Sequence, residues 1–263
     1  MHYFETPPPA ELAPWIAAVW RFRVDPQAGE IEHRIPLTGG LMLTAGSPAG
    51  GVLVGPRTAP LSTTVRGGEE YFGVHFHPGG ARPLLQLPEG SLRDAIGPAT
   101  LWLDPSWCAR WGAPGEANAK ADAEVGVERL VAALLDLVPH AAPLDVPVMV
   151  AVHTLVRSRG AEPIADLARA AGLSPRQLRR RFVAATGLAP KQLARLRRLR
   201  AAAADAVLAD RPWVEIMAER GYADQPHLVR EFRRLLGVTP VGFERHARRI
   251  DHRLVDDGAS PDE

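Results

Sequence analysis

The chain has 263 residues, a single cysteine, and 31 Lys and Arg residues against 30 Asp and Glu residues. One cysteine excludes an internal disulfide and a cysteine-rich zinc site. No basic segment leads into an apolar run near the first residue, and no window approaches the roughly 18 apolar residues that span a bilayer. We therefore expect a cytoplasmic protein without a signal peptide or membrane span.

The near-neutral total conceals an acidic half and a basic half. Residues 1–147 hold 10 Lys and Arg against 16 Asp and Glu, and residues 148–263 hold 21 against 14. This change predicts two domains, of which only the C-terminal one meets a polyanion. Since 29 of the 31 basic residues are arginines, GC-rich coding bias is an alternative source of the charge. The positions of the arginines therefore matter more than their number.

The first hundred residues consist of short runs broken by Pro and Gly. Apolar residues alternate with others in Trp20–Val24 and Phe72–Phe76, and short apolar runs recur at Leu41–Leu43 and Val52–Val54. Alternation of this kind is typical of strands that bury one face. We expect a mainly β domain, built as a small barrel or a sandwich.

The middle of the chain changes period. Residues 105–124 contain two prolines and two glycines and predict a loop, whereas residues 125–138 repeat apolar side chains at helical spacing. Prolines at 139, 143 and 147 then break the chain, and residues 148–249 predict helices joined by short turns. The polar, acidic tail from Asp251 onward has no periodicity and predicts disorder.

The C-terminal half contains an internal repeat. At an offset of 50 residues it aligns with itself in spacing and residue class, which implies two copies of one supersecondary unit. The aligned pairs are Ile164 and Val214, Ala168 and Ala218, Ala171 and Gly221, Leu178 and Leu228, Arg180 and Arg230, Phe182 and Phe232, Gly187 and Gly237, Leu188 and Val238, Pro190 and Pro240, and Leu193 and Phe243.

Each copy predicts a helix-turn-helix. A short helix ends near Ala171 or Gly221, and Ser174 or Asp224 is then placed to cap a second helix by accepting hydrogen bonds from its free N–H groups. In that second helix, apolar residues four apart face the core, which turns the opposite face outward. The core pairs are Leu178 with Phe182 and Leu228 with Phe232, and the outward faces hold Arg176, Arg179 and Arg180 in one copy and Gln225, Val229 and Arg230 in the other.

A basic helix from about Lys191 to Leu208 joins the copies. The stretch from Ser174 to Arg200 contains nine basic residues and no acidic one. Because the rest of the chain mixes both signs, contact with phosphates explains this stretch better than codon bias does, and it predicts salt-sensitive affinity. The alternative is a helical bundle with solvated basic faces. It requires two helix-turn-helix patterns and a basic connector to coincide by accident.

The stretch Gly221-Tyr-Ala-Asp-Gln-Pro-His-Leu-Val-Arg-Glu-Phe-Arg-Arg-Leu-Leu-Gly-Val-Thr-Pro240 strongly resembles the signature of AraC/XylS-type transcription regulators. With Ile164–Pro190 as the first unit, the resemblance covers residues 148–249. It implies a seven-helix domain whose two recognition helices enter successive major-groove segments of promoter DNA. It also implies a separate domain that senses a ligand or mediates dimerisation. The half beginning His2-Tyr3-Phe4 is similar to the N-terminal domain of many family members and implies no particular ligand.

The resemblance also implies roles for residues by position. Arg suits guanine and Gln suits adenine, because each makes paired hydrogen bonds to those base edges. The three consecutive arginines at 179–181 are uncommon at these positions in the family. Non-specific attraction to the DNA phosphate backbone is therefore an alternative to base reading by these residues. The implied base-reading residues are Arg176, Arg179, Arg180, Gln225, Pro226 and Arg230, and the implied phosphate contacts are Arg181, Lys191 and His227.

The expected fold is α+β, with a β-rich regulatory, effector-sensing domain at 1–145 and an AraC-type double helix-turn-helix domain at 146–250. Residues 251–263 are the expected disordered tail. Double-stranded promoter DNA is the expected partner, with RNA polymerase and a small-molecule effector as further candidates. We expect an activator or repressor that acts as a monomer or homodimer, without a cofactor or membrane contact. No phosphate loop, nucleophile elbow or paired-carboxylate pattern indicates catalysis.

Two features of the N-terminal half leave alternatives open. His75 and His77 share one face of an expected strand, a spacing that can ligate a metal in cupin-type barrels, with His33 or Glu69 as further ligands. A metal-dependent cupin-like enzyme with an incidental helical domain is therefore the competing hypothesis, although the Glu that usually follows such a pair is missing. Aromatic residues in this half either line a small-molecule pocket or belong to the core. They are Trp15, Trp20, Phe22, Tyr71 and Phe72.

Overall fold

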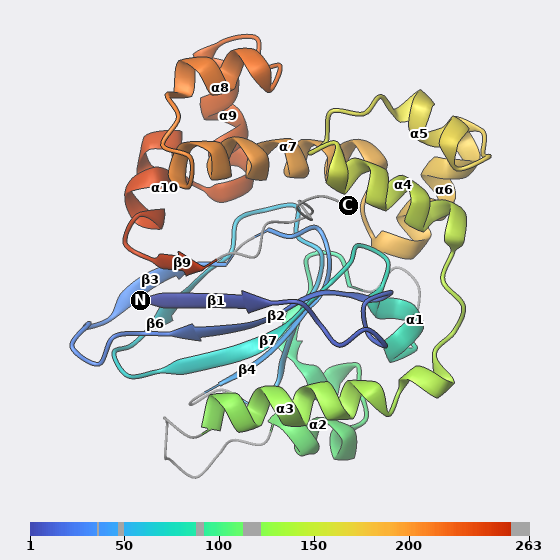
Figure 1. Cartoon of the computed structure of the whole chain (residues 1–263), viewed down its shortest axis with the longest axis vertical. Helices are drawn as coiled ribbons and strands as arrows, with labels where there is room; N and C mark the ends of the chain where they lie inside the picture. Colours follow the sequence, from blue (N-terminus) through green and yellow to red (C-terminus); the bar gives the residue numbers. More distant parts are fainter. Residues whose placement is uncertain (36, 47–49, 88–91, 113–121, 254–263) are drawn as a thin grey trace.

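The computed structural model describes residues 1–35, 37–46, 50–87, 92–112 and 122–253. Strands gather in the N-terminal half and helices in the C-terminal half, which confirms the α+β fold class (Figure 1). Among the described residues, no helix combines the length and the apolar character that a membrane crossing requires.

One large sheet organises the N-terminal half. Its strands are β1 (His2–Thr6), β2 (Ile16–Arg23), β4 (Met42–Gly46), β5 (Val52–Val54), β7 (Glu70–Phe76), β8 (Ile96–Pro98) and β9 (Asp251–Arg253). They lie in the order β8-β5-β4-β7-β2-β1-β9, and every neighbouring pair except β1 with β9 is antiparallel. The alternating segments of the sequence fall on β2 and β7, which pair with each other at the centre of the sheet.

A two-stranded ribbon, β3 (Ile31–Arg34) with β6 (Ser62–Val65), forms a second layer. Trp20, Phe22 and Val65 lie in the apolar cluster between the layers, and the ring of His33 stacks on Phe22 with a centroid distance of 4.4 Å. In the described part of the chain, β8 and β9 each pair with one strand only, so the sheet stays open. A sandwich-like arrangement therefore forms, and the expected alternative of a barrel is wrong.

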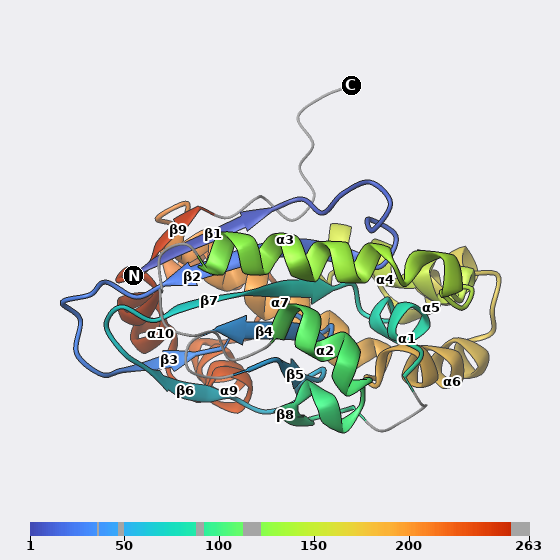
Figure 2. The same ribbon diagram turned by 90° about the horizontal axis from the view of Figure 1, so that it is seen from below.

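Helices α2 (Pro105–Gly112) and α3 (Asp122–Leu135) cover the other face of the large sheet (Figures 1 and 2). The expected helix at 125–138 is confirmed as α3, with its ends shifted by about one turn. The expected loop at 105–124 is wrong for α2. Its proline stands at the first helical position, where no N–H is needed, and Asp104 caps the helix by accepting a hydrogen bond from the Trp107 backbone N–H at 3.0 Å. Residues 113–121 lie outside the described residues.

Within α2, the side chain of Cys108 is buried with no disulfide partner. Burial raises the pKa of this thiol, and the nearby carboxylate of Asp104 raises it further. A thiol held neutral in this way packs as a small apolar side chain.

Three short elements complete the N-terminal half: helix α1 (Ala81–Leu85) and two 3-10 turns at Ala99–Leu101 and Val138–His140.

The C-terminal half is helical from residue 146 to residue 247, apart from its connecting turns. Its helices are α4 (Val146–Arg157), α5 (Ile164–Ala170), α6 (Pro175–Thr186), α7 (Pro190–Val207), α8 (Trp213–Glu219), α9 (Gln225–Leu236) and α10 (Pro240–Ala247). Two buried clusters hold them together, and α7 contributes to both, through Leu193 and Leu196 in the first and Leu199 and Ala202 in the second. Helix α7 therefore contributes side chains to both of the small hydrophobic cores.

The chain returns to the sheet after α10. Residues 251–253 form β9, parallel to β1, with the backbone of Asp251 opposite that of His2. The expected disorder from residue 251 is wrong for these three residues, because the edge of β1 supplies backbone hydrogen-bond partners that a polar sequence can use as well as an apolar one. Residues 254–263 lie outside the described residues.

Candidate nucleic-acid interface

The 50-residue repeat of the sequence is a repeat of structure. Helix α6 runs from residue 175 to 186 and α9 from 225 to 236, so both recognition helices begin and end 50 residues apart. The helices that follow, α7 and α10, begin at Pro190 and Pro240 with the same offset. Two equivalent helix-turn-helix units are thus present, as the aligned residues predict.

Both recognition helices are capped as expected. The hydroxyl of Ser174 accepts a hydrogen bond from the backbone N–H of Gln177 at 3.3 Å, and the Gln177 side chain accepts one from the backbone N–H of Ser174 at 3.0 Å. At the start of α9, the carboxylate of Asp224 accepts a hydrogen bond from the backbone N–H of His227 at 2.6 Å. These side chains use groups that a helix leaves unpaired in its first turn, and so they hold the N-terminal residues in place.

Each recognition helix is anchored by two apolar side chains four residues apart. Leu178 and Phe182 lie in the first buried cluster, and Leu228 and Phe232 lie in the second, each at most 1 % exposed. The ring of Phe232 also contacts Trp213 edge-on, with a centroid distance of 5.3 Å. These anchors decide which residues of α6 and α9 face outward.

All six residues expected to read bases are exposed. The Arg230 guanidinium lies 3.9 Å from the Asp224 carboxylate, and both side chains are more than half exposed, so little energy holds them together. Arg179 lines a hollow between α6 and α7 together with Lys191, which is also exposed. The structure thus brings one base-reading candidate and one phosphate candidate of the first unit to the same place. The exposed residues are Arg176, Arg179, Arg180, Gln225, Pro226 and Arg230.

The other two phosphate candidates already have protein partners. His227 is half-buried, packs edge-on against Tyr222, and accepts a hydrogen bond from the Ala223 backbone N–H at 3.4 Å. Arg181 donates from Nε and Nη2 to the carboxylate of Asp145, at 2.9 and 2.7 Å. A phosphate at Arg181 would have to compete with that carboxylate.

Sequence reasoning missed Asp145 and Glu231 as parts of the interface architecture. Glu231 is buried at 8 % exposure on α9 and accepts two hydrogen bonds from Arg195 of α7. Although burial raises the pKa of the Glu231 carboxyl, the hydrogen bond and charge of Arg195 outweigh burial and hold that pKa below its ordinary value. The signal was present in the sequence, since an acidic residue stands beside the core Phe232 where the first copy has a basic one.

The N-terminal half touches the C-terminal ends of both recognition helices. Gly187 and Gly237, at φ angles of 75° and 72°, end α6 and α9 in the left-handed conformation. A Cβ added at Gly187 would lie 3.3 Å from Pro56 Cγ, and one added at Gly237 would lie 3.3 Å from the ring of Pro60. Both prolines belong to the single loop between β5 and β6, so one segment contacts both units.

Two further contacts join the halves. Arg34 of β3 donates a hydrogen bond to the backbone carbonyl of Leu236, the last residue of α9, at 3.3 Å. Leu37, in the segment that follows β3, is 2 % exposed and belongs to the buried cluster of the first helix-turn-helix unit. The orientation of both units is therefore coupled to the N-terminal half by packing as well as by the hydrogen bond from Arg34.

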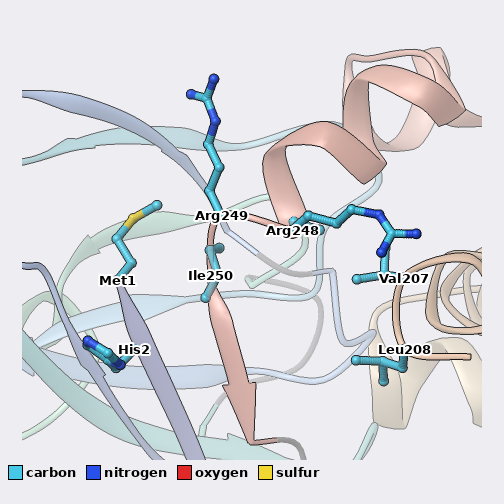
Figure 3. Close-up of a pocket in the computed structure, with 8 residues that line it drawn as sticks. Met1, His2, Val207, Leu208, Arg248, Arg249 and Ile250 are labelled. Carbon is cyan, nitrogen blue, oxygen red and sulfur yellow. The ribbon is translucent and has the colours of Figure 1, made fainter. Parts of the chain in front are cut away.

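A hollow also lies where the two halves meet, between the start of β1 and the ends of α7 and α10 (Figure 3). Residues from all three elements line it, and the side chains of Arg248 and Arg249 project in different directions around it. The lining residues are Met1, His2, Val207, Leu208, Ala247, Arg248, Arg249 and Ile250.

The histidines of the competing enzyme hypothesis have different surroundings. His75 is buried on β7, stacks on Trp20 at 5.7 Å between ring centroids, and lies with Nε2 3.2 Å from the Tyr3 hydroxyl. His77 lies beyond the end of β7, with its ring 5.4 Å from that of His153 on α4. In the described ranges, no three His, Cys, Asp or Glu residues are grouped to hold a metal ion. Trp20, Phe22 and Phe72, three of the five aromatic residues considered for a pocket, are buried in the core.

Family models match a part of each half of the chain. Residues 167–246 match a helix-turn-helix domain, and residues 4–98 match a domain of unknown function (DUF6597). No curated protein matches this chain. The first match contains both recognition helices and the whole of α7.

Several solved structures are similar to this chain. The C-terminal domain of AraT, a response regulator from Geobacillus stearothermophilus, is 22% identical over 43% of this chain and 94% of its own, with a TM-score of 0.35. ToxT from Vibrio cholerae is 9% identical over 92% of this chain and 98% of its own, with a TM-score of 0.45. ToxT bound to an unsaturated fatty acid is 11% identical over 89% and 93%, with a TM-score of 0.42.

Proposed function

We propose that this chain is a DNA-binding transcription regulator of the AraC/XylS type and that both of its recognition helices read promoter DNA; the match of residues 167–246 to a helix-turn-helix domain supports this proposal. The observation that carries the proposal is the exact structural repeat of α6 and α9, each with a buried apolar side and an exposed polar side. A helix-turn-helix places the N-terminal residues of its second helix against base edges in the major groove. Arg176, Arg179 and Arg180 would then serve one groove segment, and Gln225, Pro226 and Arg230 the next.

The connecting helix suits two units on one face of DNA. α7 has 18 residues, which corresponds to about 27 Å at about 1.5 Å per residue, close to the roughly 34 Å helical turn of DNA. Because α7 packs into both cores, it joins the two units. One chain thus offers two recognition helices, and we propose one chain per bipartite site, with Lys191 and His227 on flanking phosphates. Such a regulator would work in the cytoplasm, where promoter DNA is accessible.

Selection of binding sites from a random duplex library by the full-length protein tests this function. We expect a bipartite motif with elements about one helical turn, roughly 10 bp, apart. Arg180→Ala and Arg230→Ala are matched variants at equivalent positions, and each should degrade a different element of the motif. Failure to enrich any sequence would contradict the proposal and leave the basic half as a non-specific binder.

We further propose that residues 1–145 are the regulatory part and act through the loop between β5 and β6. Pro56 and Pro60 of this loop contact the ends of α6 and α9, so a small-molecule effector that shifted the loop would change the distance between the units. Pro60→Gly should loosen the preferred spacing between the motif elements, and replacement of the exposed Pro7 by glycine is the matched control. An unchanged spacing preference in Pro60→Gly would contradict this role. Contact with RNA polymerase stays a prediction.

The proposed function involves no catalysis, and one measurement separates it from the enzyme alternative. Metal analysis of the purified protein should find no stoichiometric transition metal that depends on His75 and His77. Metal at one equivalent, lost when both histidines are replaced, would instead support a metal-dependent enzyme. His75 and His77 face different neighbours, Trp20 and His153, which favours a packing role for both.

A further inference from the structure

The two helix-turn-helix units contain ion pairs of the same geometry. In the first, Arg181 of α6 donates from Nε and Nη2 to the two carboxylate oxygens of Asp145, which caps α4. In the second, Arg195 of α7 donates from Nε and Nη2 to the two carboxylate oxygens of Glu231 on α9. Each pair therefore joins a recognition helix to the helix that precedes its unit.

These four residues obey the same 50-residue offset as the rest of the repeat. Asp145 corresponds to Arg195, and Arg181 corresponds to Glu231. The acidic partner thus lies on the preceding helix in the first unit and on the recognition helix in the second. The position and geometry of the ion pair are the same in both units, while the acidic and basic partners are exchanged. This indicates that the ion pair itself is needed at this place, whichever of the two helices carries the acidic residue.

We propose that these pairs are equivalent, charge-reversed clamps that set the rotation of α6 and α9, and that Arg181 and Glu231 are positioning residues for DNA recognition. The proposal rests on the proposed function and gives Arg181 a role other than phosphate contact. It also explains why an acidic residue, Glu231, stands on a helix that approaches a polyanion.

The place of each clamp on its helix supports this role. Arg181 and Glu231 directly precede the buried Phe182 and Phe232 and directly follow the exposed Arg180 and Arg230. Successive residues of a helix point about 100° apart, so the phenylalanine and the clamp hold the helix in two different directions. An apolar contact alone is non-directional and leaves rotation weakly determined.

Small rotations matter at this distance from the helix axis. A rotation of about 20° moves an atom about 6 Å from the axis by about 2 Å, which exceeds the tolerance of a hydrogen bond to a base edge. Bidentate guanidinium–carboxylate pairs are well suited to prevent it, because two parallel N–H···O bonds define an orientation as well as a distance. The clamps therefore favour base discrimination by the neighbouring Arg180 and Arg230.

Charge exchange in the protein tests the inference. Arg181→Glu alone places two carboxylates face to face and should weaken affinity for the selected site by about tenfold, within the range of coupling seen for directly paired residues. The double variant Asp145→Arg with Arg181→Glu recreates the arrangement of the second unit and should recover affinity to within about threefold. Arg195→Glu with Glu231→Arg is the matched exchange in the second unit, with Glu231→Arg as its single variant.

The salt dependence of binding separates a clamp from a phosphate contact. The double variant Asp145→Arg with Arg181→Glu should keep the salt slope of the unaltered protein, whereas loss of a true phosphate contact would lower the slope by about one unit. A folded double variant without recovered affinity, or with a lowered slope, would overturn the inference. If Arg181→Glu does not fold, Asp145→Asn, which keeps an oxygen to cap α4, replaces it as the variant that breaks the pair and should weaken binding less.

Thermal unfolding distinguishes failure of this inference from failure of the proposed function. If the unaltered protein selects no DNA sequence, the proposed function fails, yet the exchange of Arg195 and Glu231 should still restore the unfolding temperature that Glu231→Arg loses. The exchange of Asp145 and Arg181 should restore all of the loss except the part due to the α4 cap that Asp145→Arg removes. If the protein selects a site and the exchanges restore neither stability nor affinity, the clamp inference alone is wrong.

Discussion

The residues of α6 that are expected to read bases are three arginines, whereas those of α9 are a glutamine, a proline and one arginine; Arg233 and Arg234 are also exposed, nearer the C-terminal end of α9. The two helices have the same length and end at a left-handed glycine in the same way, so the main difference between them lies in their side chains. A cluster of arginines attracts phosphates whatever the sequence, and single polar side chains next to neutral ones discriminate between base edges. At the base-reading positions, the first unit therefore supplies more of the attraction to phosphates and the second more of the specificity.

The charge pairs differ in burial as well as in sign. The side chains of Arg181 and Asp145 are 35% and 28% exposed, and those of Arg195 and Glu231 are 29% and 10% exposed. An ion pair is less screened by solvent when it is more buried. Added salt should therefore weaken the ion pair of the second unit less than that of the first. A more stable ion pair suits the unit whose base-reading residues supply more of the specificity.

The largest expected effects come from the equivalent phenylalanines. Phe182→Ala and Phe232→Ala should each reduce the free energy of unfolding by about 3–5 kcal/mol, because each removes a fully buried ring from a separate small core. Denaturant unfolding of both variants measures this. A cost well below that range for one variant only would show that the two cores are not equivalent.

The next largest expected effect is a difference between the two units in how strongly they discriminate between bases. Arg230→Ala should cost about 1–3 kcal/mol of binding free energy at the selected site and relax base preference there. Arg180→Ala should degrade its own motif element but relax base preference less than Arg230→Ala does, since its neighbours are also arginines. Quantitative binding to selected and random DNA measures the contrast. Equal weakening on all sequences by Arg230→Ala would assign that residue to phosphate.

Loss of the N-caps should give smaller, matched effects. Ser174→Ala and Asp224→Ala should each destabilise the protein by about 0.5–2 kcal/mol, because a backbone N–H in the first turn loses its acceptor. Ser174→Asn and Asp224→Asn are the controls that keep a capping oxygen. Thermal unfolding of the four variants checks the prediction, and alanine variants as stable as the asparagine controls would contradict it.

The smallest expected effect lies at the start of α7. Lys191→Ala should weaken binding to selected and random DNA alike and lower the salt slope by about one unit, because one phosphate contact is removed. Arg110→Ala, on α2 and paired with Asp136, is the control at a distance from the recognition helices. An unchanged slope in Lys191→Ala would remove this residue from the interface.

Much of the helical half could be predicted because its signals are local. The caps at Ser174 and Asp224, the apolar spacing of Leu178 and Phe182, and the left-handed glycines each act within a few residues of the chain. Where a signal was ambiguous, prediction failed. Helix α2 was expected as a loop because its proline and glycine stand at its two ends, and β9 was missed because its only support is the edge of a strand some 250 residues earlier in the chain.

The sequence by itself determined the two repeated units, their caps and the residues that face outward, since helical periodicity decides which side of a helix is buried. Only the tertiary structure decided the partners across elements: Asp145 with Arg181, Arg195 with Glu231, and the loop prolines against Gly187 and Gly237. The physical reason is that an ion pair or a packing contact depends on a distance in space, which residue spacing along the chain does not encode when the partners lie on different helices or in different halves of the molecule.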